Sequence, residues 1–165
     1  MKVRLMNDPI LREPTVPVVQ DELGYIRSLV PEMTKVMTYE EGNGLAANQV
    51  GISKRFFILK NGDEVKLVVN PEILELGPLL PFQEGCLSIP GTSAVTQRAR
   101  KLKLKYRDEN FNEIEEEYNN LLAVAIQHEV DHLDGKLYID QLPAMRRLLT
   151  VDRHVKFLRT KGRRK

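Results

Sequence analysis

The feature that most constrains the fold is the segment 120–134, in which apolar residues recur on two faces of an expected helix. Side chains three or four residues apart share one face of an α-helix. One face holds Leu121, Val124, Ala125, His128 and His132, and another holds Leu122, Ile126, Val130 and Leu133. Gly135 follows, and glycine is a common residue just beyond a helix end. A helix that is apolar around so much of its circumference is expected to be buried in the middle of a domain.

The same helix carries a His-Glu-x-x-His pattern at residues 128–132. The two histidines are four residues apart, so both imidazoles lie on one face, where a single ion can bind both. Glu129 is rotated by about 100° from His128 and is better placed to contact a water on the ion than to be a ligand. Burying these three polar side chains without a partner would be costly. The pattern therefore predicts a metal site with two histidine ligands and Glu129 as general base.

A catalytic site of this kind needs a third protein ligand. The candidates downstream, none of them at a convincing spacing, are Asp134, Asp140, Asp152 and His154. Upstream lies Cys86, the only cysteine, within the segment Glu84-Gly85-Cys86-Leu87-Ser88. A cysteine thiolate is a common metal ligand, but a lone cysteine is equally often a small buried apolar residue. From the local residues alone, both interpretations of Cys86 remain open.

A further segment, 42–49, combines two glycines and two alanines and ends on Gln49. Glycine lets a backbone approach a ligand closely, and the Gln49 amide offers a hydrogen-bond donor. A plain turn followed by a small-residue packing segment would have the same composition, so this segment alone assigns no function.

The remaining periodicities predict an α+β fold, with curved antiparallel sheets around the central helix that carries His-Glu-x-x-His. Residues 56–59 and 66–69 flank Asn61-Gly62-Asp63, a hairpin signal. Residues 101–106 alternate Lys and Leu and are expected to pair with 111–118. Further helices are expected from about 21 to 39, with Pro31 bending or delaying it, and from 143 to 159. Three prolines indicate an extended arm over the first 17 residues.

The chain's 165 residues fit one domain. A single cysteine excludes a secreted disulfide scaffold. There is no signal-peptide pattern and no apolar window approaching a membrane span, so we expect a cytoplasmic protein without a membrane partner. Residues 146–165 hold nine of the 25 Lys and Arg and one of the 23 Asp and Glu. This basic tail is either a solubilising terminus or a contact for a polyanion.

Three segments, in order, resemble the peptide deformylase family. They are Gly-x-Gly-Leu-Ala-Ala-x-Gln at 42–49, Glu-Gly-Cys-x-Ser at 84–88 and Gln-His-Glu-x-Asp-His-x-x-Gly at 127–135. The resemblance covers roughly residues 1–142, which would form the catalytic domain, and 143–165 would be a basic C-terminal helix or tail of the same domain. It implies a metallohydrolase that removes the formyl group from the initiator methionine of nascent polypeptides.

The resemblance also implies a role for each motif. Cys86, His128 and His132 would hold one divalent ion with water in the fourth position. Fe(II) would be the native ion, and Zn, Ni or Co could replace it. Metal-bound hydroxide would attack the formyl carbon, with Glu129 as general base and acid and with Gln49 and the backbone N–H of Leu87 stabilising the oxyanion.

Substrate contacts follow from the same resemblance. Leu121, Val124 and Ala125 would line the methionine pocket, and the peptide would lie along Gly44 and Gly85 like an added strand. Arg98 and Asp131 are expected to pair and orient the site, or to form an ordinary structural salt bridge. Three residues depart from the family pattern: Asn43, usually aliphatic, Asn120, commonly glycine, and Ser93, often arginine.

Two other functions compete with this one. A small zinc peptidase would need a carboxylate or histidine as third ligand. A non-catalytic metal protein docked on the ribosome would need neither Glu129 nor Gln49. The basic tail is expected to contact the ribosome without sequence-specific nucleic-acid binding, so truncation after Leu142 should weaken ribosome binding and spare activity on short peptides.

Overall fold

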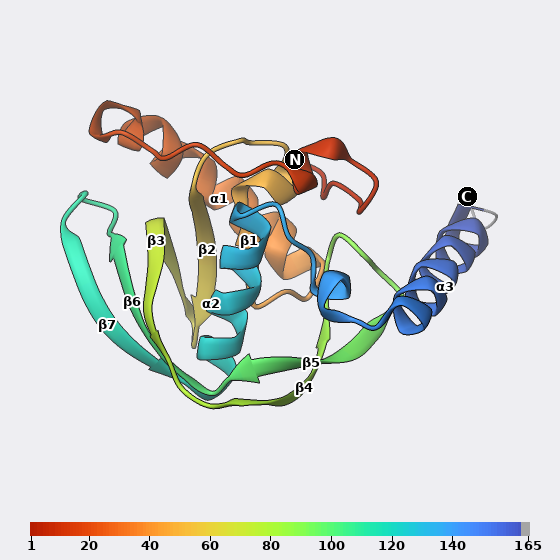
Figure 1. The fold of residues 1–165 in the computed structure, drawn as a ribbon. Coiled ribbons are helices and arrows are strands. Elements are labelled where there is room, and N and C mark those ends of the chain that lie inside the picture. Colours follow the sequence, from red (N-terminus) through yellow and green to blue (C-terminus); the bar gives the residue numbers. More distant parts are fainter. Residues whose placement is uncertain (163–165) are drawn as a thin grey trace.

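The computed structural model describes residues 1–162, with side chains as far as residue 160. Figure 1 shows the arrangement of its elements. The α-helices are α1 (Leu23–Tyr39), α2 (Asn120–Leu133) and α3 (Ala144–Gly162). The strands are β1 (Gly44–Ala46), β2 (Phe56–Asn61), β3 (Glu64–Leu76), β4 (Leu79–Gly85), β5 (Ser93–Ala99), β6 (Lys101–Arg107) and β7 (Glu113–Asn119). The short 3-10 helices are η1 (Pro9–Arg12), η2 (Gln20–Glu22), η3 (Ala47–Val50) and η4 (Tyr138–Gln141).

The strands form two antiparallel sheets. One has five strands in the order β1-β2-β3-β6-β7, and the other is the two-stranded ribbon β4-β5. The predicted mixture of helices with antiparallel sheets is therefore confirmed. Strand β6 shows the expected alternation, because Leu102, Leu104 and Tyr106 are buried. On its other face Lys101 and Lys103 form ion pairs with acidic residues of β7.

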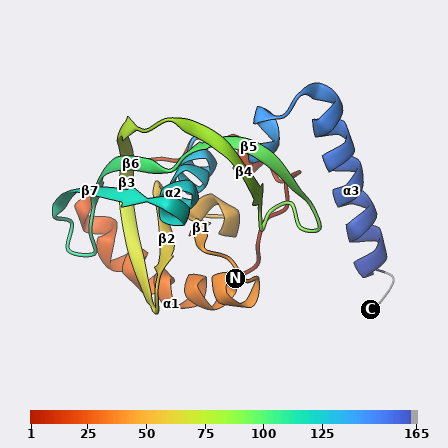
Figure 2. The same cartoon turned by 90° about the horizontal axis from the view of Figure 1, so that it is seen from below.

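The two faces of the larger sheet carry different cores. Phe56 and Ile58 of β2 belong to a cluster with α1, whereas Phe57 and Leu59 belong to a cluster with Ile126 of α2. Successive side chains of a strand point to opposite faces, so α1 and α2 pack on opposite sides of β2. Figure 2 shows this layering. Helix α2, which carries the His-Glu-x-x-His motif, thus packs against the face of the sheet that bears Phe57 and Leu59.

Backbone conformation fixes both ends of α2. Asn120 has a φ of 53°, in the left-handed region, which lets β7 turn directly into the helix. Asparagine tolerates this region better than most residues, as expected at this departure from the family pattern. Gly135, just after the helix, has a φ of 73°, as the predicted helix stop requires.

Several sequence-based expectations need correction. The N-terminal arm is not extended throughout, because Pro9–Arg12 forms η1, capped by the Asp8 side chain. Strands β4 and β5 were not expected, nor were β1 and η3 within the segment 42–50. Pro31 lies inside α1. Helix α3 extends beyond residue 159, and residues 163–165 of the predicted tail lie outside the described residues. No helix in the described part of the chain is long and apolar enough to cross a membrane.

Candidate metal centre and active site

The C-terminal half of α2 and the loop after β4 bring three metal-binding side chains together. The ring centroids of His128 and His132 lie 4.9 Å apart. The Cys86 Sγ lies 3.1 Å from His132 Nε2. The candidate ligand atoms of all three residues lie within 4.8 Å of one another. Bonds of about 2.3 Å to sulfur and 2.0–2.1 Å to nitrogen require such closeness, so the donor set fits one divalent ion.

The downstream candidates for a third ligand have other partners. Asp134 accepts a hydrogen bond from Arg55, and Asp140 pairs with Arg12. Asp152 pairs with Lys156, one turn further along α3. His154 contacts a backbone carbonyl of the loop after β4. The geometry therefore favours Cys86 among the candidates.

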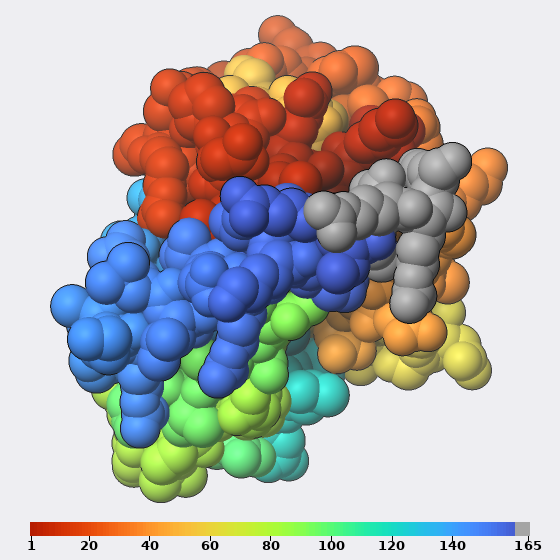
Figure 3. Space-filling view, turned by 90° about the vertical axis from the view of Figure 1, so that its right-hand side faces the viewer, coloured from red at the N-terminus to blue at the C-terminus, as the bar shows by residue number. Residues whose placement is uncertain are grey.

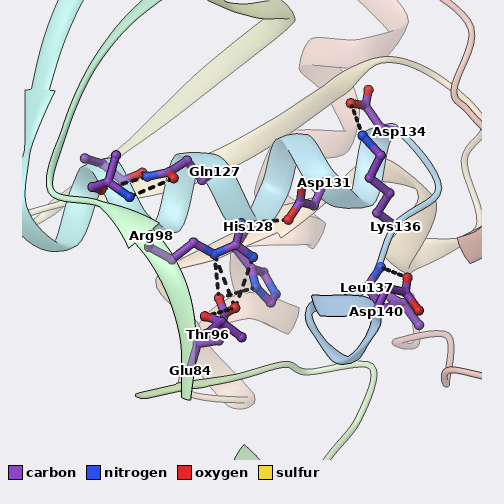
Figure 4. A network of polar contacts seen from close by, with 12 residues as sticks. Glu84, Thr96, Arg98, Gln127, His128, Asp131, Asp134, Lys136, Leu137 and Asp140 are labelled. Carbon is purple, nitrogen blue, oxygen red and sulfur yellow. Dashed lines mark hydrogen bonds and ion pairs between the residues drawn. The ribbon is translucent and has the colours of Figure 1, made fainter. Parts of the chain in front are cut away.

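A buried charge network orients His128 (Figure 4). Glu84 Oε2 lies 3.2 Å from His128 Nδ1 and accepts a hydrogen bond from the Nδ1–H. Such a bond leaves Nε2 free to bind an ion. Arg98 donates to Glu84 at 3.0 Å and to Asp131 at 2.7 Å. Thr96 Oγ1 donates to Glu84 at 2.6 Å. The expected Arg98–Asp131 pair is present. Arg98 contacts the Glu84 carboxylate that holds His128, and Asp131 lies on the same helix as His128.

The charge of Glu84 is stabilised despite its burial. Burial alone would raise the pKa of Glu84, but the hydrogen bond from His128, the charge of Arg98 and the hydrogen bond from Thr96 outweigh it and lower the pKa to about 2. Glu84 is therefore a carboxylate at neutral pH and a strong hydrogen-bond acceptor for the imidazole.

Glu129 has the environment of a proton acceptor. It is 3% exposed, and its Oε2 has no hydrogen-bond partner in residues 1–162. Burial raises the pKa of Glu129 to about 7, against the opposing charge of His128. A carboxylate with a pKa near neutral can both take and return a proton. Gly44 of β1 lies against this side chain, since a Cβ there would stand 2.5 Å from Glu129 Oε1.

The amide of Gln49 points toward the cysteine loop. Its Oε1 accepts from the Ala46 N–H at 2.9 Å, which fixes the side chain. Its Nε2 lies 3.3 Å from Ser88 Oγ and 3.7 Å from Cys86 Sγ. Beside Cys86, the N–H of Leu87 makes no backbone hydrogen bond within the described residues. Two donors thus stand close to the metal ligands.

These groups border a cavity of about 390 Å³. Most of the residues assigned from the sequence line it: Gly44, Gln49, Gly85, Cys86, Leu87, Leu121, Val124, Ala125, His128 and Glu129. Three of them, His132, Arg98 and Asp131, do not line it. The volume is sufficient for a short peptide end and a side chain, since small-molecule sites begin at about 300 Å³.

Comparison with known proteins identifies the family. The family model described as polypeptide deformylase matches residues 1–148. The chain belongs to the polypeptide deformylase family. Peptide deformylase from Thermotoga sp. (strain RQ2) is 39% identical over 149 residues, 90% of each chain. The crystal structure of a peptide deformylase from Legionella pneumophila has a TM-score of 0.93 at 34% identity, covering 98% of this chain and 97% of that one. A class I type b peptide deformylase from Acinetobacter baumannii, with Met-Ala-Ser bound, has a TM-score of 0.81 at 33% identity, covering 86% and 98%.

The departures from the deformylase pattern have distinct positions. Asn43 lines the cavity, so its amide can contact a ligand. Ser93 does not line it, because its Oγ accepts from Gln83 Nε2 at 2.7 Å on the β4-β5 ribbon. A change at position 43 is therefore the more direct route to altered substrate preference.

Sequence reasoning missed some residues of this deformylase site. Glu84 was quoted within its motif, but its contact with His128 spans 44 positions. Pro90, Gly91 and Thr92 line the cavity, as does Phe82. The only sequence signal for them is the run Leu-Ser-Ile-Pro-Gly that follows Cys86, since glycine and proline mark a turn.

Proposed function

We propose that this deformylase-family chain hydrolyses the N-formyl group of the initiator methionine of nascent polypeptides and releases formate. One observation carries the proposal. Cys86 and His128, which cluster with His132, border the same cavity as Glu129, whose Oε2 has no hydrogen-bond partner in the described residues. Metal-assisted hydrolysis needs this combination of an ion site and a proton acceptor. The helix that carries the motif is proposed as the central helix of the fold, with the sheets curved around it.

The cofactor is one divalent ion held by Cys86, His128 and His132. Fe(II) is proposed as the native ion, and Zn, Ni or Co as ions that can replace it, because thiolate and imidazole ligands suit all of these metals. When bound, such an ion lowers the pKa of a water molecule and so supplies a nucleophile near neutral pH.

The chain's own residues then handle the proton and the charge. Glu129 takes the proton of the attacking water and passes it to the departing amine, which its pKa of about 7 allows. The Gln49 amide and the Leu87 N–H donate to the oxygen of the formyl group as it becomes negative. Since Gln49 is 1% exposed and held through Ala46, its donor needs little reorganisation.

The substrate is a formyl-Met peptide. Leu121, Val124 and Ala125 offer an apolar wall for the flexible methionine side chain. Gly44 and Gly85, without side chains, let the peptide backbone approach β1 and the end of β4 as an added strand. The Acinetobacter relative with bound Met-Ala-Ser supports this choice, because that tripeptide begins with methionine.

We also propose that the basic residues of the C-terminal part contact the ribosome, and that the protein acts in the cytoplasm. Arg146, Arg153 and Arg159 lie on the exposed side of α3. Phosphate-rich RNA binds such a surface through charge, and salt weakens the binding. Cosedimentation with ribosomes should decrease when these arginines are changed to glutamine, while formate release from a short peptide persists. Equal cosedimentation of both proteins would refute the contact.

The first experiment is formate release from formyl-Met-Ala-Ser by protein purified without oxygen, with its metal content measured. We expect rapid release and about one metal ion per chain, and Glu129→Ala should abolish release while keeping the ion. Cys86→Ser should lose the ion, whereas a peptidase with a downstream ligand would keep it. Cleavage of internal peptide bonds without formate release would contradict the proposal.

A further inference from the structure

Helix α3 is largely exposed, but one turn of it is buried against the loop that follows β4. His154 is 2% exposed, and its Nδ1 lies 3.0 Å from the carbonyl oxygen of Pro90, 64 positions away in the chain. A carbonyl only accepts hydrogen bonds, so Nδ1 carries the proton and donates. Val151, one turn earlier, packs against an apolar cluster that includes Ile89 of this loop. Figure 3 shows α3, in blue, lying across this side of the molecule next to the green loop segment.

A second contact lies next to the first. Gly91 has a φ of 79°, and a Cβ built on it would stand 2.3 Å from the Phe157 Cγ. The ring of Phe157 therefore rests directly on the backbone of Gly91. Since 154 and 157 are three residues apart, both side chains leave α3 on the same face. Two neighbouring residues of the loop are thus held by one face of the helix.

The loop held in this way belongs to the active site. It begins with the metal-ligand candidate Cys86, and Pro90, Gly91 and Thr92 line the cavity. Its turn is tight, because the Ile89 N–H donates to the Cys86 carbonyl at 3.0 Å. Thr92 Oγ1 donates to the Ile89 carbonyl at 2.9 Å. A displacement of Pro90 or Gly91 therefore reshapes the cavity wall rather than a free surface loop.

We propose that His154 and Phe157 are positioning residues that hold the Pro90–Thr92 wall of the substrate cavity, so that α3 contributes to substrate affinity. The inference rests on the proposed deformylase activity. It gives a function to the one histidine outside the metal motif. It also distinguishes the side chains of α3 that contact the loop from the exposed basic residues of the same helix.

The test compares single substitutions on α3 in the full chain loaded with metal. His154→Leu removes the donor, and His154→Asn keeps an N–H at a similar place. Val155→Ala, on the exposed side, is the control. For formyl-Met-Ala-Ser we expect His154→Leu to raise KM about three- to tenfold, the factor that one net hydrogen bond is worth. The kcat should change less than KM, His154→Asn should recover most of the affinity, and the control should match the wild type.

Hydrogen–deuterium exchange of the 87–95 segment, without substrate, supplies a readout that does not depend on turnover. Exchange should be faster in His154→Leu than in the wild type and close to wild type in His154→Asn. A folded His154→Leu protein with unchanged KM and unchanged exchange would overturn the inference. If this variant does not fold, Phe157→Ala, which keeps the hydrogen bond, is judged by the same two measurements. Absence of formate release by the wild type would instead reject the proposed function. The exchange result alone would then decide whether His154 and Phe157 hold the Pro90–Thr92 wall.

Discussion

Replacing Gly44 by alanine tests whether β1 positions the general base. The new Cβ would lie 2.5 Å from Oε1 of Glu129, 2.8 Å from its Cγ and 2.9 Å from its Cδ. Ordinary contacts are about 3.5 Å, so the carboxylate must move by about 1 Å. It can do so without disturbing the core, because Glu129 borders the cavity. The backbone of Gly44 does not have a positive φ, so alanine causes no strain of its own there.

The size of the effect follows from this displacement. A misplacement of about 1 Å can cost on the order of 100-fold in rate, and loss of a general base costs about 10²–10⁴-fold. We therefore expect Gly44→Ala to lose about 100-fold in kcat for formyl-Met-Ala-Ser. The free energy of unfolding should stay within about 1 kcal/mol of the wild type, since a Gly-to-Ala change at a compatible position is mildly stabilising.

The assay measures kcat, metal content and urea denaturation for Gly44→Ala and for Gly24→Ala. Gly24, in α1, is the matched control because a Cβ there meets no atom within 4 Å. The double variant Gly44→Ala/Glu129→Ala should be no slower than Glu129→Ala alone, since both changes act on one group. A fully active Gly44→Ala enzyme would refute the reasoning. So would a loss of activity that merely follows a loss of metal.

Three further predictions concern residues around the site and the helix ends. Glu84→Gln replaces the carboxylate that holds His128, so metal affinity should fall about 10- to 100-fold in a chelator competition, and unchanged affinity would show that the contact is not needed. Asn120→Ala should lower the free energy of unfolding by about 1 kcal/mol because alanine disfavours a φ of 53°, whereas Asn120→Gly should stay near the wild type in urea titrations. Burial would raise the pKa of Asp140, but the Leu137 N–H and Arg12 outweigh it and lower the pKa below 3.8. Its stabilisation is then present above pH 3.8 and lost as the pH falls through the lowered value. The difference in free energy of unfolding between the wild type and Asp140→Asn should therefore shrink as the pH falls below 3.8, and a constant difference would contradict this.

The parts of the fold that sequence predicted are those specified by local patterns. Helix α2 has a helical apolar period and a glycine stop, and the β2-β3 hairpin has two short apolar runs joined at Gly62-Asp63. Strands β4 and β5 lack such a signal. Leu79 and Leu80 are 56% and 48% exposed, and Pro81 follows them. The face that the ribbon buries carries the polar residues Glu84, Thr96 and Arg98, so it has no period-two hydrophobic pattern to recognise.

The same distinction applies to the site. The pair His128 and His132 could be anticipated from the spacing of a short motif, whereas Cys86 was expected to join them only through the resemblance to the family. The contact of Glu84 with His128 could not, because it depends on how β4 passes α2. In the folded structure, the motif Glu-Gly-Cys makes two different contributions to the site. Cys86 offers a ligand atom, and Glu84, two positions earlier, holds the imidazole of another.

Helix α3 shows why composition alone can mislead about a tail. The segment 146–165 holds nine basic residues. This composition suggested a surface element that could be removed without affecting the activity on short substrates. Yet truncation after Leu142 removes not only these charges but also the His154 donor and the Phe157 ring that contact Pro90 and Gly91. A truncated enzyme with weaker ribosome binding and a raised KM would therefore be ambiguous. Substitutions confined to the exposed arginines or to the buried His154 separate the two effects, because the first keep the contacts with Pro90 and Gly91 and the second keeps the basic charges.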